Sequence, residues 1–322
     1  MQRVIKILAV LGCAGLVPLA LAQPYPNKPV RLIVGVPPGG AADFVGRIVG
    51  QKLSDAFGQN VVVENRGGAG GTIASDITAK ANADGYTLQL SSVTTHGVGP
   101  VLYTKLPYDA LKDFTHIGLA ANLPMIMVVH VSVPARSPKE LIELAKAKPG
   151  SLNFASASSG SLPHLVGELF RAKTGAEITH VPYKGSGPAV VDLAAGQVQI
   201  MFDAVPSLYA QIKAGRLRVL ASVYSKRSSV FPEAPTLGEA GFPGIEGVIW
   251  YGVSGPAGIP KDVVARVNAE LNKLLALPDV IERFASQGAV PAPTTPQQYT
   301  AFIKSEMAKW GAVVKASGAK VD

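Results

Sequence analysis

Two loops rich in glycine and serine have the residue types that bind small anions. The first, VPPGGAAD at residues 36–43, lies between a β-branched run and a helical pattern. Gly39 and Gly40 allow a ligand to approach the backbone, and the free N–H groups of residues 40–43 would face outward at the positive end of a helix. An ordinary strand-to-helix turn with Asp43 as the N-cap explains the same residues equally well.

The second loop, FASASSGSLPH at residues 154–164, repeats this arrangement ahead of another helical pattern. Its hydroxyl and amide groups can hydrogen-bond a carboxylate without adding formal charge. A capped helix start is again the plain alternative. Both loops follow a predicted parallel strand at its carboxyl end, where open α/β sheets bind ligands. Two lobes that face each other would therefore hold an anion between two helix starts, which favours a ligand with a carboxylate at each end.

Three further segments are weaker candidates for the same cleft. TTH at 94–96 follows a predicted strand, YKGSGP at 183–188 precedes a helix, and Asp203 follows another strand. Asp203 would meet an amino group on a ligand, or it would cap the helix after Pro206. Simple turns are the alternatives for the other two segments. The predicted ligand-binding residues are Pro38, Gly39, Gly40, Ala41, Ala42, Asp43, Ser92, Thr94, Thr95, Ser156, Ser158, Ser159, Gly160, Ser161, His164, Lys184 and Asp203.

Motifs for catalysis, metals and cofactors are missing from the sequence. NRGGAGG at 65–71 lacks the GxxxxGK[ST] lysine and the GxGxxG spacing, so it predicts a flexible or tight loop. The histidines show no HExxH-like spacing, and there is no GxSxG nucleophile elbow. We therefore expect no enzyme activity, no metal and no cofactor. The alternative is a secreted hydrolase that uses Ser158, His164 and Asp203, because these side chains could face one cleft.

Short β-branched runs alternate with helical patterns, which predicts an α/β protein with parallel strands. Gly58 would end one helix, and Ser137 with Glu140 would form a capping box at the start of another. Extended crossings near residues 117–125 and 245–254 would connect two sheets. The predicted strands are 30–35, 60–65 and 86–92 in one set and 125–131, 152–156, 177–183, 199–205 and 217–223 in the other.

The predicted fold is that of a two-lobed binding protein of the type II class. Each lobe would be a mainly parallel sheet flanked by helices, with the cleft between the lobes and a hinge that allows closure. Lobe 1 would comprise residues 23–121 and 255–322, because the C-terminal helices return to it. Lobe 2 would comprise residues 122–254.

Residues 1–22 have the features of an export signal. Arg3 and Lys6 precede an apolar stretch, and the small residues at 20–22 predict cleavage after Ala22, which would release a soluble periplasmic protein. The single cysteine, Cys13, lies in this leader, and lipidation at VLGC is the alternative to its removal. No later stretch is apolar for long enough to span a membrane.

The charge pattern argues against a nucleic-acid partner. The formal net charge is +8, and loss of the leader would lower it by two. Lysine and arginine are scattered and never form a run of three, so a solvated basic surface is the favoured interpretation.

Ordered blocks along essentially the whole mature chain resemble one family. VPPGGAAD, NRGGAGG, LNFASASSGSLPH, VPYKGSGPAVVDLAAGQVQIMFD, AGRLRVLA, EAPTLGEAGFPG and AKWGAVVKASG are similar to blocks of the Bug-type receptors of tripartite tricarboxylate transporters. The resemblance implies a two-lobed periplasmic receptor that closes on a small carboxylate. It further implies delivery to the large and small membrane subunits of a transporter, and we expect the receptor to be a monomer. An adaptor that signals to a sensor protein would use the same cleft.

The resemblance also implies roles for individual residues. The loops at 37–43 and 156–164 would contact the carboxylates through backbone and hydroxyl groups, often with bridging waters. His164 would lie at the start of the second-lobe helix, and Asp203 would set specificity for ligands with an amino group.

Two departures from the family pattern leave the ligand open. Val36 stands where phenylalanine is frequent, and Thr94 and Thr95 lie in a region that is often rich in serine and asparagine.

Overall fold

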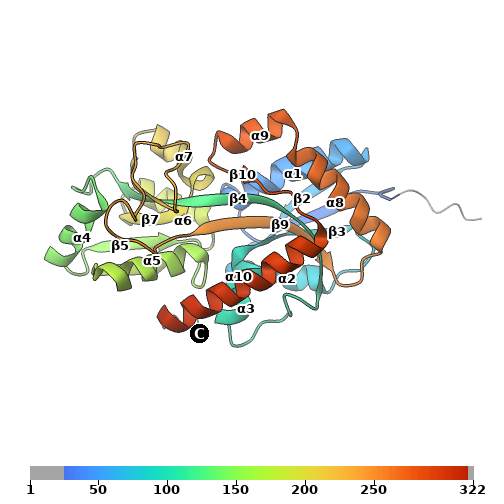
Figure 1. Ribbon diagram of the computed structural model, residues 1–322, viewed down its shortest axis with the longest axis horizontal. Coiled ribbons are helices and arrows are strands. Elements are labelled where there is room, and N and C mark those ends of the chain that lie inside the picture. The colour runs from blue at the N-terminus through green and yellow to red at the C-terminus, as the bar shows by residue number, and fades with distance from the viewer. Residues whose placement is uncertain (1–24, 318–322) are drawn as a thin grey trace, which may run out of the picture.

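The computed structural model describes residues 25–317, which form two α/β lobes joined by two long strands. Figure 1 shows the lobes side by side, with β4 and β9 running from one to the other. The predicted leader, including Cys13, lies outside the described residues. Lobe 1 contains β1 (Val30–Val34), β2 (Val61–Asn65) and β3 (Thr87–Ser92), lobe 2 contains β5 (Leu152–Ser156), β6 (Ile178–Pro182), β7 (Ile200–Ala204) and β8 (Leu217–Val223), and the crossing strands are β4 (Phe114–His130) and β9 (Val248–Pro256).

The strands are hydrogen-bonded in the order β2-β1-β3-β9-β4-β7-β5-β6, and β8 and β10 (Val290–Pro291) both pair with β4. In lobe 1, β1 lies parallel between β2 and β3, and in lobe 2, β5 lies parallel between β6 and β7. Every pairing that involves β4 or β9 is antiparallel. The predicted two-lobed α/β class is confirmed, and its sheets are mixed because the two crossing strands join the parallel strands in the opposite direction.

The connection between the lobes depends on β4 and β9. The first part of β4, residues 114–124, pairs with β9, and residues 125–130 pair with β7 and β8. Movement of one lobe against the other must therefore bend these two strands, as in a hinge. The predicted lobe boundaries at residues 121/122 and 254/255 fall inside β4 and β9, and as boundaries they stay a prediction.

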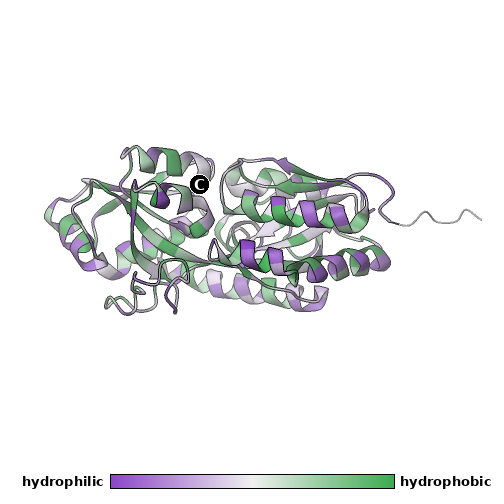
Figure 2. Cartoon of the chain, turned by 90° about the horizontal axis from the view of Figure 1, so that it is seen from above, coloured by the Kyte–Doolittle hydropathy of each residue, from purple (hydrophilic) through white to green (hydrophobic). Residues whose placement is uncertain are grey.

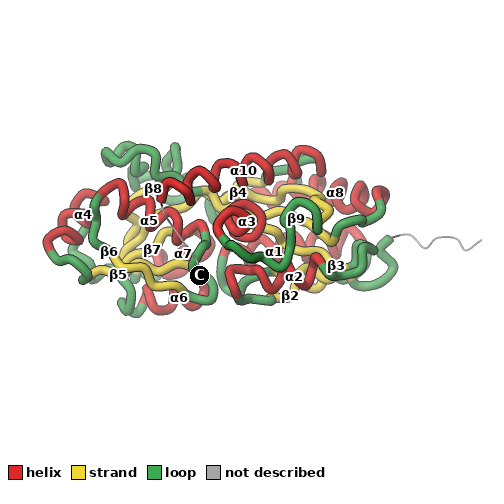
Figure 3. The backbone as a smooth tube through the Cα atoms, turned by 90° about the horizontal axis from the view of Figure 1, so that it is seen from below, coloured by secondary structure: helices red, strands yellow, loops and turns green. Residues whose placement is uncertain are grey.

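Helices cover both faces of each sheet, as Figure 3 shows. Figure 2 shows the strands mostly in hydrophobic colours, while the helices alternate between polar and apolar residues. The C-terminal helices α8 and α10 contact β4 from the lobe 1 side, and α10 also contacts α5. The helices of lobe 1 are α1 (Ala41–Phe57), α2 (Thr72–Ala79), α3 (Gly99–Leu102), α8 (Lys261–Leu275), α9 (Pro278–Ala285) and α10 (Pro296–Ser317). The helices of lobe 2 are α4 (Pro138–Ala147), α5 (Leu162–Thr174), α6 (Ser186–Ala194) and α7 (Val205–Lys213). Two short helical segments are η1 (Ala69–Gly71) and the π-helical η2 (Val93–Val98).

The start of α1 differs from the prediction at one residue. Its N-cap is Gly40, and Asp43 is the third helical residue, where its carboxylate accepts the N–H of Gly39 (3.2 Å). An acidic side chain at this position reaches back to an amide ahead of the helix, so Asp43 is not the N-cap. The end of α1 agrees with the sequence, because Gly58 is the C-cap in the left-handed conformation.

The predicted capping box of α4 is half formed. Ser137 Oγ accepts the N–H of Glu140 (3.2 Å), as predicted. The Glu140 carboxylate instead accepts the N–H of Arg136 (2.8 Å), one residue before the N-cap.

None of the helices between residues 25 and 317 is both long and apolar enough to cross a membrane.

Two helical glycines provide a matched test of the packing that holds α5 in place. A Cβ on Gly167 would collide with the Phe154 ring on β5, whereas a Cβ on Gly311 would have its nearest neighbour at 3.6 Å. We expect Gly167→Ala to destabilise the protein by about 2 kcal/mol through overpacking. Gly311→Ala should be neutral or stabilising by up to about 1 kcal/mol, because alanine favours a helix. Urea unfolding of both variants measures this, and equal effects would contradict the packing of α5 on β5.

Candidate functional site

A cavity of about 380 Å³ lies between the two lobes. Lobe 1, lobe 2 and the crossing strand β9 all contribute to its wall. The residues from lobe 1 are Gly35, Val36, Pro37, Gly40, Ala41, Ala42, Gly68, Ala69, Gly70, Gly71, Leu90, Ser92, Thr94, Thr95 and Tyr103, those from lobe 2 are Ala157, Ser158, Ser159, Ser161, Pro163, Pro182, Tyr183, Lys184, Gly185, Ser186 and Asp203, and those from β9 are Ile249 and Tyr251.

Most of the predicted ligand-binding residues lie on this wall. They are Gly40, Ala41, Ala42, Ser92, Thr94, Thr95, Ser158, Ser159, Ser161, Lys184 and Asp203. The remaining six, Pro38, Gly39, Asp43, Ser156, Gly160 and His164, lie off the wall. The two predicted loops therefore do meet at one cavity, although not every residue in them faces it.

The start of α1 presents backbone donors to the cavity. Among the described residues, no protein acceptor is present for the N–H groups of Ala42 and Asp43. The N–H of Ala41 is already paired, because it donates across the cleft to Ser207 Oγ in α7 (3.1 Å). One of the amides expected to be free is thus used to hold the lobes together.

The Asp43 side chain is turned away from the cavity. Its carboxylate accepts hydrogen bonds from Arg47 (2.9 Å), from Asn65 (3.1 Å) and from the Gly39 N–H. Burial acts to raise the pKa of Asp43, but these hydrogen bonds outweigh it and the pKa is lowered. Asp43 is therefore an ionised carboxylate that fixes the loop from behind.

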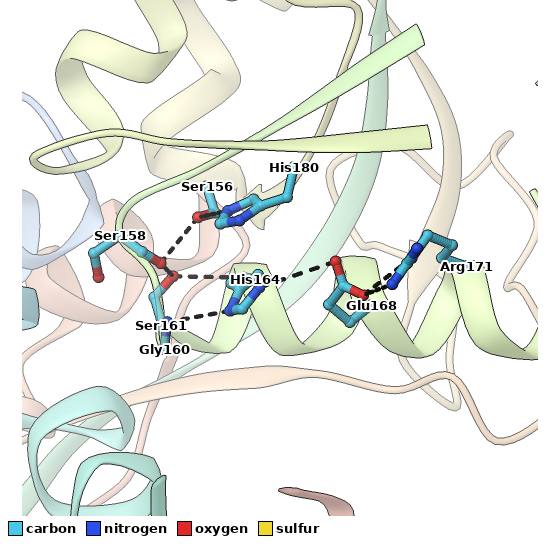
Figure 4. Close-up of polar contacts among 8 residues, drawn as sticks. All are labelled: Ser156, Ser158, Gly160, Ser161, His164, Glu168, Arg171 and His180. Atoms are coloured by element: carbon cyan, nitrogen blue, oxygen red, sulfur yellow. Dashed lines mark hydrogen bonds and ion pairs between the residues drawn. The ribbon is translucent and has the colours of Figure 1, made fainter. Parts of the chain in front are cut away.

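The loop of lobe 2 is held by a stacked pair of histidines. Ser161 is the N-cap of α5, and Gly160 donates its N–H to His164 Nδ1 (3.1 Å). The His164 and His180 rings stack with centroids 4.0 Å apart, and Figure 4 shows both behind the loop. Burial, the largest effect, lowers the pKa of both rings, to about 3 for His180. His164 therefore orients the loop, while its ring does not line the cavity.

Asp203 lies at the cavity wall but is nearly inaccessible, with 1% of its surface exposed. It accepts hydrogen bonds from Ser186 Oγ (2.5 Å) and from the N–H of Ala204 (2.6 Å), and Ser207 Oγ lies 3.5 Å away. Burial raises the pKa of Asp203 to about 6 despite these donors. The N-cap of α7 is Ala204, so Asp203 does not cap that helix.

The hydrolase arrangement is not assembled in the structure. His164 receives the Gly160 N–H on one ring nitrogen, and its other ring nitrogen lies 4.0 Å from Glu168. Asp203 is bonded to Ser186, and no hydrogen bond links it or Ser158 to His164 in the described part of the chain. The residues between 25 and 317 also contain no group of three or more side chains that could hold a metal ion.

The glycine loop that precedes α2 lines the cavity but is not among the predicted ligand-binding residues. Gly68, Gly70 and Gly71 all have positive φ and line the cavity. A Cβ on Gly70 would lie 3.1 Å from Tyr103 Oη and 3.4 Å from Ser158 Oγ, so the loop passes where the lobes meet. The signal was present in NRGGAGG, which lacks the phosphate-loop patterns and was predicted to be a flexible or tight loop. No pattern in the sequence indicated that Tyr103 would line the cavity.

The comparisons with known proteins agree with this architecture. The family model of the tripartite tricarboxylate transporter family receptor matches residues 45–319. Protein BugT of Bordetella pertussis is 41% identical over 321 residues, which cover 98% of each chain. The structure of R. palustris Rpa4515 with adipate has a TM-score of 0.90 at 35% identity, covering 92% of this chain and 100% of that one. MatC from Rhodopseudomonas palustris with bound malate has a TM-score of 0.85 at 31% identity, covering 90% and 100%.

Two α/β lobes that enclose a cavity lined by helix starts define a solute-binding receptor of the periplasmic class. The chain belongs to the family of tripartite tricarboxylate transporter receptors, so the resemblance found in the sequence is confirmed.

The raised pKa of Asp203 predicts a pH-dependent stability that its amide analogue lacks. The pKa rises from 3.8 to about 6 on folding, so the contribution of Asp203 is full below pH 3.8 and is lost as the pH rises through 6. We expect the free energy of unfolding of Asp203→Asn, relative to the unsubstituted protein, to increase by about 2 kcal/mol between pH 4 and pH 7. Urea unfolding at both pH values measures this, and a constant difference would contradict the burial of a carboxylate that has hydrogen-bond donors but no cationic partner.

Proposed function

We propose that the protein captures a small organic carboxylate in the cavity between its lobes and delivers it to a membrane transporter. The observation that carries this proposal is the convergence of helix starts from both lobes on one cavity. Ala42 near the start of α1 and Ser186 at the start of α6 line the cavity, and no acceptor among the described residues is present for their N–H groups. Such groups at the positive end of a helix favour an anion.

The charges around the cavity fit binding by neutral donors. Lys184 is the basic residue and Asp203 the acidic residue among the described residues of the wall. Lys184 is exposed, so a buried cation does not neutralise the ligand. Each charge-assisted hydrogen bond contributes about 1.5–3 kcal/mol. Four or five of them, after association costs of several kcal/mol, give micromolar affinity, about −8 kcal/mol.

The wall also contains apolar surface, from Leu90, Ile249 and the prolines at 37, 163 and 182. A ligand with carboxylate ends and a hydrocarbon middle matches this distribution, since charged ends need donors and the middle does not. The relatives support the same class, because their structures were obtained with adipate and malate. Which of the mono-, di- or tricarboxylates binds is the part that an experiment has to decide.

The partners follow from the family. Receptors of this family are named for a tripartite transporter, and we infer that the closed receptor docks on its large and small membrane subunits as a monomer. Cleavage after Ala22 would release it into the periplasm.

Calorimetric titration of residues 23–322 against a panel of carboxylates tests the proposal. The panel contains malate, adipate, citrate, benzoate and glutamate, and the matching alcohols or amides serve as uncharged controls. We expect at least one carboxylate to bind with a dissociation constant in the micromolar range or below, and no control to bind. Absence of binding by every carboxylate would contradict the proposed function.

The close approach of Gly40 to lobe 2 provides a test of closure. A Cβ on Gly40 would lie 3.4 Å from the Ser186 Cβ, and the backbone of Gly40 is extended, so valine fits locally but its methyl groups would separate the lobes. We expect Gly40→Val to weaken carboxylate binding at least tenfold without lowering the unfolding temperature. Gly238→Val is the matched control, because Gly238 is exposed and lies outside the cavity. Unchanged affinity of Gly40→Val would show that ligand capture does not need this contact.

A further inference from the structure

The conformation of the Ser158–Ser159 peptide is fixed by three donors on one carbonyl. The Ser158 carbonyl oxygen accepts Ser156 Oγ–H (2.9 Å), Ser161 Oγ–H (2.7 Å) and the Ser161 N–H (3.2 Å). Ser156 and Ser161 are both buried, and Ser158, Ser159 and Ser161 are among the residues that line the cavity. The carbonyl therefore points toward the buried hydroxyls of Ser156 and Ser161 within lobe 2, as the dashed lines in Figure 4 show.

A trans peptide points its C=O and its N–H in opposite directions. Because the Ser158 carbonyl faces the interior of lobe 2, the Ser159 N–H faces the cavity. No protein acceptor for this N–H is present among residues 25–317. A buried carboxylate in the cavity would supply the missing acceptor.

The Ser159–Gly160 peptide is also fixed, but both of its polar groups already have protein partners. The Ser159 carbonyl accepts Tyr103 Oη–H from lobe 1 (3.2 Å), and the Gly160 N–H donates to His164 Nδ1 (3.1 Å). The Gly160 amide is therefore unavailable to a ligand, although the sequence placed it among the candidates. The Tyr103 bond forms only when the lobes are together, so closure and the orientation of this loop are coupled.

His180 completes the arrangement from behind. Its Nε2 lies 2.7 Å from Ser156 Oγ, and the single hydroxyl proton of Ser156 is already donated to the Ser158 carbonyl. Because one hydroxyl proton serves one acceptor at a time, a Ser156 hydroxyl that donates to the Ser158 carbonyl accepts its second hydrogen bond from a proton on His180 Nε2. Stacking on His164 (centroids 4.0 Å apart) and contact with the Phe154 ring (4.9 Å) hold the His180 ring in place.

We propose that Ser156 and His180, which do not line the cavity, are positioning residues that present the Ser159 N–H as the lobe 2 donor to the ligand carboxylate. This inference rests on the proposed function for the identity of the ligand as a carboxylate. The chain of donors runs from His180 to Ser156 to the Ser158 carbonyl, and loss of either side chain removes or weakens one of the three hydrogen bonds that hold this peptide.

Three variants and one control separate positioning from simple destabilisation. Ser156→Ala removes the hydroxyl, His180→Phe keeps a stacking ring without a donor, and His180→Gln places a donor where Nε2 lies. Ser222→Ala is the control, because Ser222 is equally buried in lobe 2 and donates to the Lys226 carbonyl (2.8 Å), away from the cavity. Each is titrated with the tightest-binding carboxylate of the panel, starting with adipate, and each is unfolded thermally.

We expect Ser156→Ala and His180→Phe to weaken binding about tenfold, the equivalent of one impaired hydrogen bond. His180→Gln should restore affinity to within about threefold of the unsubstituted protein. Ser222→Ala should lose stability but keep its affinity. Equal affinities for all four variants, or equal losses in His180→Gln and His180→Phe, would overturn the positioning role.

A measurement without ligand makes the inference independent of the proposed function. Amide exchange with water, followed by nuclear magnetic resonance, should be fast at Ser159 and slow at Gly160 in the unsubstituted protein, and the difference should shrink in Ser156→Ala. Slow exchange at Ser159 would overturn the predicted orientation, whatever the ligand is. If exchange is as expected but no carboxylate binds, the orientation stands and the proposed function fails.

Discussion

Backbone N–H groups in the first turn of a helix have no acceptor within that helix, so something outside it must supply one. In this receptor the starts of α1 and α6 reach one cavity with such groups at Ala42 and Ser186, and the loop before α5 adds the N–H of Ser159, none of the three having an acceptor among residues 25–317. Leaving them without an acceptor in a closed site is costly. An anion that bridges the lobes satisfies them together, which couples ligand capture to closure.

The lobes also make direct contacts that limit how far they open. Ala41 donates to Ser207 and Tyr103 donates to Ser159, each across the cleft. Both are hydrogen bonds between neutral groups, and none of the ion pairs found among residues 25–317 joins the two lobes. A ligand then needs to contribute only a few hydrogen bonds to shift the equilibrium toward closure. The crossing strands β4 and β9 pair along residues 114–124 of β4, so a movement of one lobe against the other would have to bend them.

The sequence predicted the elements well where local chemistry decides the outcome. Strand runs of β-branched residues, the left-handed Gly58 and the Ser137 cap were all readable, because each depends on residues close in the chain. The positions of the two crossing strands were also indicated by the sequence. Their antiparallel pairing was not, because pairing direction depends on contacts between segments far apart in the chain.

For the site, the sequence identified both loops but not the side of each loop that faces the ligand. Asp43 and His164 have the right chemistry, yet Arg47 and Asn65 draw the first away and Gly160 and His180 hold the second behind the loop. These partners are brought close by the fold and by the path of the loop, so the residue types alone do not show which way each side chain points. The 68–71 loop was missed for a related reason, since its glycines match neither phosphate-binding pattern, and their approach to the cleft depends on contacts with Tyr103 and Ser158 from other parts of the chain.

The most direct test of this account is a nuclear magnetic resonance titration of the isotope-labelled mature protein with its tightest-binding carboxylate. The account predicts that the amide protons of Ala42, Ser159 and Ser186 shift downfield together, with one common binding curve. Shifts confined to a single lobe, or amide signals at these three positions that do not move while the ligand binds elsewhere, would contradict capture of the anion between the two lobes.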